Sequence, residues 1–129
     1  MAVSFNQEVF AAFKTLSVQS SDDLKVGETY YAFFFQSVYK YTLTEILTER
    51  EGYARRGLLT NSQNADELAW VVLNNEAEGK EVTHSLQDSN IDGGGYNPYM
   101  LFRNKKIADA YASLIDVKFF VDDDDWFYD

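Results

Sequence analysis

The sequence has 129 residues, a length typical of a single domain with its own core, and 46% of them are hydrophobic and 16% aromatic. It contains no Cys, which excludes disulfides, thiolate metal ligands and thiol nucleophiles. The formal net charge of −10 disfavours binding to nucleic-acid backbones and anionic lipids unless basic residues are locally concentrated.

Apolar residues at helical spacing predict an amphipathic helix near the start of the chain. The helix covers residues 5–16, and Phe5, Val9 and Phe13 lie on its apolar face. Ser4 stands where an N-cap residue would begin the helix. We expect this helix to lie on a sheet, because core packing is the commonest reason for such a stripe.

Aromatic and β-branched residues dominate residues 26–60, which predicts the nucleus of the sheet. The stretch is expected to form three strands, over residues 29–36, 39–49 and 53–60. The first strand is apolar on both faces, so both faces should be covered, one of them by the N-terminal helix. Ile46 and Leu47 break the alternation of the second strand and indicate a bulge or a bend, and Glu51-Gly52 predicts a turn.

The second half of the chain continues the same pattern. It predicts further strands over residues 68–73, 81–87 and 99–102, a helix over residues 105–115 and an edge strand over residues 117–121. Asn104 can cap the helix. The sequence therefore predicts an α+β fold, with a small antiparallel β-sheet or partly open barrel of about six strands on which an N-terminal and a C-terminal helix pack. The aromatic core would lie between these two helices.

No linker or internal repeat divides the chain. We expect one β-rich globular domain over residues 1–121 and an acidic-aromatic tail over residues 122–129. No apolar run approaches the ~20 residues of a membrane span, and no basic segment followed by an apolar core begins the chain. These observations favour a cytoplasmic protein without membrane contact.

The sharpest local motif is Asp88-Ser-Asn90-Ile-Asp92-Gly, which matches the first positions of an EF-hand calcium loop. Asp88, Asn90 and Asp92 are therefore candidate calcium ligands. The last position of the loop is Tyr99 instead of Glu, and Pro98 blocks a following helix. The other interpretation is a long hairpin loop in which Asx side chains bind local backbone amides.

The single histidine, His84, alternates with other residues of a predicted strand beside Val82 and Leu86. It should point inward and be hydrogen-bonded. No nucleophile or acid stands at a recognisable spacing from it, and the sequence contains no Gly-x-Ser-x-Gly or His-Glu-x-x-His motif. The sequence therefore predicts a non-enzymatic protein with no catalytic residues and, calcium aside, no cofactor.

The C-terminal tail combines four adjacent carboxylates with three aromatic residues. Four like charges in a row are either solvated or bound to a basic surface. The aromatics either fold back onto the domain or form a docking tip for a basic, grooved partner, in the manner of the acidic tails that the segment resembles in single-stranded-DNA-binding proteins. The candidate partner-binding residues are Asp122, Asp123, Asp124, Asp125, Trp126, Phe127 and Tyr128.

Two segments resemble a wider group of proteins. Lys25-Val-Gly-Glu-Thr-Tyr-Tyr leads into a strand, and Met100-Leu-Phe-Arg-Asn-Lys-Lys-Ile-Ala-Asp-Ala-Tyr leads from a strand into a helix. Together they resemble small SH3-like or OB-like barrel proteins encoded by bacteriophages. The resemblance implies an accessory or host-directed role in the cytoplasm of an infected cell.

Three hypotheses for the function follow. The first is a small acidic binding protein, a host-directed or anti-defence inhibitor that mimics DNA and occupies the basic, nucleic-acid-binding surface of a partner. The second is a single-stranded nucleic-acid-binding barrel with exposed stacking aromatics and a partner-recruiting tail. Its candidate backbone-binding residues are Arg55, Arg56, Arg103, Lys105 and Lys106. The third is a virion structural or assembly component.

Overall fold

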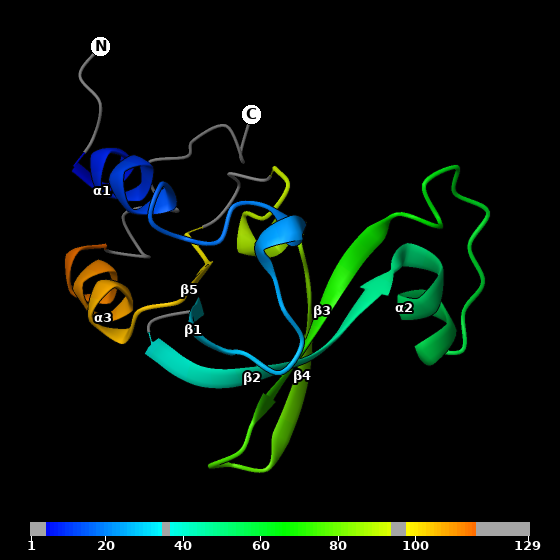
Figure 1. The fold of residues 1–129 in the computed structure, drawn as a ribbon. Helices are drawn as coiled ribbons and strands as arrows, with labels where there is room; N and C mark the ends of the chain where they lie inside the picture. Colours follow the sequence, from blue (N-terminus) through cyan, green and yellow to red (C-terminus); the bar gives the residue numbers. More distant parts are fainter. Residues whose placement is uncertain (1–4, 35–36, 94–97, 116–129) are drawn as a thin grey trace.

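A computed structural model describes residues 5–34, 37–93 and 98–115. In chain order the elements are α1 (Phe5–Lys14), η1 (Ser21–Asp23), β1 (Thr29–Phe34), β2 (Ser37–Thr48), α2 (Glu49–Arg55), β3 (Leu68–Asn75), β4 (Lys80–Ser85), η2 (Gln87–Ser89), β5 (Met100–Phe102) and α3 (Lys105–Leu114), where η denotes a short 3-10 helix. Figure 1 shows their arrangement.

The five strands form one antiparallel sheet in the order β4-β3-β2-β1-β5. The sheet is strongly curved. Two strands lie between β4 and β1, yet the ring of His84 on β4 stacks on Phe34 of β1 with 3.9 Å between ring centroids. The predicted α+β class with an antiparallel sheet is confirmed, with five strands in the described residues instead of about six.

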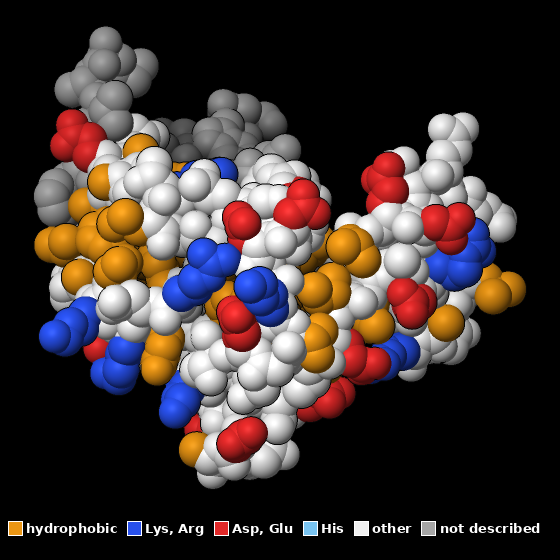
Figure 2. Space-filling model, viewed as in Figure 1, with side chains coloured by type: hydrophobic (Ala, Val, Ile, Leu, Met, Phe, Trp, Pro, Cys, Tyr) orange, Lys and Arg blue, Asp and Glu red, His pale blue; other side chains and the backbone are white. Residues whose placement is uncertain are grey.

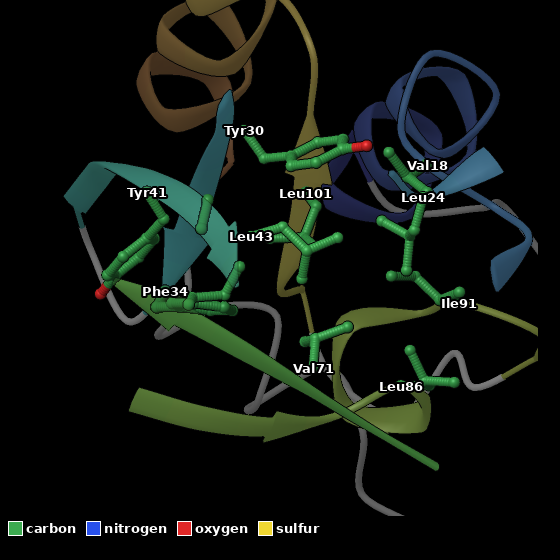
Figure 3. Close-up of a cluster of buried hydrophobic side chains, with 12 residues drawn as sticks. Val18, Leu24, Tyr30, Phe34, Tyr41, Leu43, Val71, Leu86, Ile91 and Leu101 are labelled. Atoms are coloured by element: carbon green, nitrogen blue, oxygen red, sulfur yellow. The ribbon is translucent and has the colours of Figure 1, made fainter. Parts of the chain in front are cut away.

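The concave face of the sheet holds the larger core cluster. Tyr30, Ala32 and Phe34 alternate along β1 and point into it, as the period of a strand requires. Two connecting segments close it: Val18 donates its backbone N–H to Leu101 and Leu86 donates to Ala69, each at 2.8 Å. Figure 3 shows how the side chains from these strands and loops meet.

The opposite face of β1 and β5 carries both long helices. Phe33 and Phe102 pack there against Phe13 of α1 and Tyr111 of α3, with the rings of Phe33 and Tyr111 edge to face at 5.2 Å. The predicted cover on both faces of β1 is confirmed. The prediction that the core lies between the two helices is wrong, because both lie on one face and loops cover the other.

The predicted strand over residues 53–60 and the turn at Glu51-Gly52 are also wrong. The helix α2 covers Glu49–Arg55, and residues 56–60 form a turn and a loop. Thr48 begins the helix with a capping box. Its Oγ1 accepts from Glu51 N–H at 3.2 Å, and its own N–H donates to Glu51 Oε1 at 3.0 Å. The hydrogen bond that the Glu51 carboxylate accepts from Thr48 N–H lowers the pKa of Glu51. Gly52 lies inside the helix, where it faces the indole of Trp70.

The predicted irregularity of β2 is confirmed. Its register against β3 shifts between Leu43 and Glu45 and again between Leu47 and Thr48. Beyond the second shift the chain enters α2, and α2 together with residues 56–67 projects away from the sheet (Figure 1). We call this projection the arm.

The other predicted elements in the described residues are confirmed, with ends that shift by one or two residues. The side chain of Asn104 accepts from Lys106 and Ile107 N–H and caps α3 as expected. Ser4, the edge strand over residues 117–121 and the boundary between domain and tail lie outside the described residues. None of the described helices is long and apolar enough to cross a membrane.

Candidate binding cleft

A cleft of about 750 Å³ separates the base of the arm from the body of the molecule. Figure 2 shows this hollow, with hydrophobic side chains along its base and acidic side chains on both rims. Its volume falls in the range of ligand pockets, roughly 300–1,000 Å³. Strand β3 forms its floor, the arm forms one wall, and η1 with residues 86–93 forms the other. We call it the binding cleft.

The arm wall presents two carboxylates, those of Glu49 and Glu67. Backbone hydrogen bonds hold them on the same wall: Glu49 N–H donates to Glu67 O at 3.0 Å and Arg50 N–H donates to Ala65 O at 2.9 Å. An exposed ion pair from Arg50 to Asp66, at 3.3 Å, lies on the same segment. The returning chain is thereby fastened to the first turn of α2.

Trp70 lies on the floor, and its ring is fixed from several sides. The ring of Tyr53 stands edge to face with it at 6.3 Å, and the guanidinium of Arg56 lies 4.8 Å from the indole centroid. Gly52 faces the Nε1 edge of the indole, and this buried Nε1 has no hydrogen-bond partner among the described residues. Trp70 therefore joins the arm to the sheet.

The opposite wall is built by the loop that contains the calcium-like motif. Asp92 lies in the left-handed region with φ 57°, its Oδ1 accepts from Ser21 N–H at 2.9 Å, and its N–H donates to Gln19 O at 2.8 Å. Asn90, also left-handed and 1% exposed, donates from Nδ2 to Tyr99 O at 2.6 Å. The predicted hairpin is wrong, because β4 and β5 lie at opposite edges of the sheet, and the Asp92 side chain binds the backbone of a distant segment instead of a local amide.

The three candidate calcium ligands have different environments. Asp88 is exposed and donates its backbone N–H to Ser85 Oγ at 2.9 Å, Asn90 is buried, and Asp92 binds the backbone of η1. Within residues 5–34, 37–93 and 98–115, no group of three or more His, Asp or Glu side chains is placed to hold a metal ion. Calcium binding by this loop stays a prediction.

The described residues that line the cleft include acidic and apolar side chains. Among the described residues that line it, Glu49, Glu67 and Asp92 are acidic and none is basic. The Oε2 of Glu49 is buried and has no hydrogen-bond partner in the described part of the chain. A buried carboxylate oxygen without a donor costs free energy. Leu68, which is 46% exposed, adds apolar surface beside it. The cleft therefore has an acidic lining beside exposed apolar surface, and the buried Glu49 oxygen lies beneath that lining.

The structure separates the basic residues that were predicted to bind nucleic acid. Arg55 and Arg56 belong to the arm, whereas Arg103, Lys105 and Lys106 lie where β5 leads into α3, at the opposite end of the molecule in Figure 1. They form two separate groups. Neither group lines the binding cleft.

Most of these cations already have partners within the chain. Arg55 pairs with Glu45, and Lys105 Nζ binds Asp109 at 2.7 Å. Arg103 donates from Nη2 to the backbone O of Asp23 at 2.7 Å. All three contacts are exposed, so they hold these side chains only weakly.

His84 points inward, as predicted, and stacks on Phe34 with 21° between the ring planes. Burial lowers the pKa of the imidazole, and the Asp88 carboxylate partly opposes this shift. The structure shows no hydrogen bond to the ring from any described residue, so its inward position rests on the stacking. No described nucleophile is hydrogen-bonded to it.

The predicted tail residues, Asp122 to Tyr128, lie outside the described residues. Comparison with protein-family models, with curated proteins and with solved structures gives no match. The resemblance to bacteriophage barrel proteins therefore rests on the two quoted segments. The binding cleft itself was missed from the sequence, although Thr48-x-x-Glu51 is a capping-box pattern that predicts α2 and places Glu49 at its start.

Proposed function

We propose that this chain is a small, acidic, non-enzymatic binding protein that covers a basic, nucleic-acid-binding surface of a partner protein. The partner would be a host protein if the chain is phage-encoded. In this role the protein acts as a host-directed or anti-defence inhibitor, and its carboxylates take the positions that phosphates occupy in the natural complex. Attraction between surfaces of opposite charge speeds the encounter and selects the partner.

The observation that carries the proposal is the binding cleft. It combines Glu49, Glu67 and Asp92 with the exposed apolar surface of Leu68, and no described cation lies between them. Acidic groups that surround apolar surface fit a basic partner better than a nucleic acid, because phosphates would be repelled. The net charge of −10 acts in the same direction.

The proposal is tested by capture and competition. The full chain is immobilised, a nuclease-treated bacterial lysate is passed over it, and duplex DNA is then added as competitor. We expect basic DNA-binding proteins to be retained and to be released by the DNA, because both ligands compete for one surface. Retained proteins that DNA does not release would contradict the proposal.

A direct titration separates this function from single-stranded nucleic-acid binding. A fluorescent oligothymidylate is titrated with the protein at low salt, where binding to phosphates is strongest. The proposed function predicts no change in anisotropy. A binding curve that weakens with added salt would favour the nucleic-acid-binding barrel instead.

A further inference from the structure

We propose that Trp70 and Glu49 form a latch, a hydrogen bond from the indole Nε1–H to the Glu49 carboxylate that fastens the arm to the sheet. Trp70 belongs to β3, on the floor of the cleft, and Glu49 is the first residue of α2, on its arm wall. The latch joins two parts of the chain itself and needs no partner protein, so it holds or fails separately from the proposed function.

The two residues lie close together at the base of the arm. Trp70 is paired with Leu47 in the β2–β3 ladder, and Glu49 follows Leu47 by two residues. Glu49 and Gly52 are three residues apart in α2, so they share one face of the helix, with Cβ positions about 5–6 Å apart. The Nε1 edge of the indole approaches Gly52 so closely that a Cβ there would overlap it. Rotation of the Glu49 side chain about its χ angles can therefore bring a carboxylate oxygen to the indole N–H.

The two unpaired atoms at this joint are complementary. The indole Nε1 is a donor only, and a carboxylate oxygen is an acceptor. Trp70 Nε1 and Glu49 Oε2 are both buried, and neither has a hydrogen-bond partner among the described residues. Because both atoms are shielded from water, their partners have to come from within the protein. A hydrogen bond between them satisfies both and removes the free-energy cost of two unpaired buried groups.

The cations near this pair are engaged elsewhere. Arg50 binds Asp66 at 3.3 Å. The Arg56 guanidinium lies over the face of the indole, 4.8 Å from its centroid, rather than at the Nε1 edge. No described cation forms an ion pair with Glu49. The Glu49 carboxylate is therefore available to the indole.

The latch fixes the angle of the arm. The ring of Trp70 already meets Tyr53 of the arm edge to face at 6.3 Å. Apolar contacts are not directional, whereas a hydrogen bond requires a defined distance and angle. The chain enters the arm at the register shift between Leu47 and Thr48, where the ladder is interrupted. A hydrogen bond beside this point holds the arm wall at a set distance from the opposite wall and so sets the width of the cleft.

Hydrogen exchange of the Trp70 indole N–H tests the bond. The chain has two tryptophans, so Trp126→Phe leaves Trp70 as the one indole signal in the NMR spectrum. In this background Glu49→Ala removes the acceptor, whereas Glu49→Gln keeps a carbonyl oxygen that can accept. We expect the indole N–H to exchange about tenfold faster in the alanine variant and within about twofold of the parent in the glutamine variant. Glu67→Ala, which removes an exposed carboxylate from the same wall, should also stay within about twofold of the parent.

A distance measurement across the cleft tests whether the bond holds the arm. The chain has no Cys, so Gln63→Cys on the arm and Asp22→Cys on the opposite wall accept one spin label each. We expect a narrow distribution of distances between the labels in the parent and in Glu49→Gln, and a broader one in Glu49→Ala. Trp70→Phe removes the donor and keeps an aromatic ring, so it should broaden the distribution as Glu49→Ala does. Combining these two changes should add nothing.

Thermal unfolding checks that each variant is folded, and if Glu49→Ala is not, Trp70→Phe decides through the distance distribution. An indole N–H that exchanges at the same rate in the parent and in Glu49→Ala would overturn the latch. Faster exchange with an unchanged distribution, or additive effects of Glu49→Ala and Trp70→Phe, would also overturn it, because the bond would then not hold the arm. The proposed function stands in each case, since retention of basic proteins and their release by DNA are measured on the unaltered chain.

Discussion

At the scale of single residues, the core depends on polar atoms that aromatic side chains bring into it. Tyr111 is fully buried and its hydroxyl donates to Pro98 O at 2.7 Å. Burial raises the pKa of this phenol, so the hydroxyl keeps its proton and remains a donor throughout the physiological range. The bond ties α3 to the chain that leads into β5.

Replacing Tyr111 with Phe tests this contact. The ring still packs on Phe33 and Phe13, but the buried carbonyl of Pro98 loses its donor. We expect the free energy of unfolding to fall by about 1–2 kcal/mol in chemical denaturation. Tyr39→Phe is the control, because no described residue hydrogen-bonds the Tyr39 hydroxyl, and it should cost less than about 0.5 kcal/mol. Equal losses in the two variants would contradict the account.

His84 predicts a pH dependence of stability. Its pKa is lowered in the folded protein, so the unfolded chain takes up a proton near pH 6.5 before the folded chain does. The contribution of His84 to the free energy of unfolding is therefore fully present above about pH 6.5, and it is lost as the pH falls toward the folded pKa. Urea unfolding at about pH 7.5 and 5.5 should show a larger decrease for the wild type than for His84→Phe, which keeps the stacking on Phe34. Equal decreases would show that other groups cause the effect.

At the scale of elements, the arm depends on the contact between α2 and β3. An added Cβ at Gly52 would overlap Cδ1 and Nε1 of Trp70, so this position admits no side chain unless the indole moves. Glycine in a helix lowers helix propensity, and here the close approach of the indole explains why it is needed.

The variant Gly52→Ala measures this contact. We expect it to lower the free energy of unfolding by about 1–3 kcal/mol, in spite of the higher helix propensity of alanine. The same change in a Trp70→Leu background should cost less, because the smaller side chain leaves room for the methyl group. A cost that is identical in both backgrounds would show that the two residues do not interact.

Local patterns explain which elements could be predicted from the sequence, and the contact between Gly52 and Trp70 explains one that could not. The strands around Tyr30 and Val71 and the helix after Asn104 follow from local periodicity and capping, and they form where expected. Residues 53–60 contain Tyr, Thr and two Leu, which favoured a strand. The capping box at Thr48 and the packing of Gly52 under Trp70 favour a helix over Glu49–Arg55 instead, and residues 56–60 follow it without a strand.

The binding cleft was beyond a sequence-based prediction for a different reason. Its walls come from Ser21, Glu49 and Asp92, which are far apart in the chain and meet only because the sheet curves and the arm projects from it. No local pattern encodes such a meeting. The acidic character of the protein, in contrast, was evident from its net charge of −10.

At the scale of the whole molecule, the faces of the sheet have separate roles. The helices α1 and α3 cover one face, loops cover the other, and the binding cleft opens at the end where the arm leaves the sheet. Leu86 and Ile91 belong to both the larger core cluster and the lining of the cleft. We therefore propose that a basic partner is bound at the cleft end of the molecule.

Hydrogen–deuterium exchange on the complex with a captured basic protein tests this claim most directly. Backbone amides that a partner covers exchange more slowly than in the free protein. We predict slower exchange in both walls and the floor of the cleft, in residues 19–23, 65–71 and 86–92. Slower exchange confined to α1 and α3, or to residues 116–129, would contradict the account.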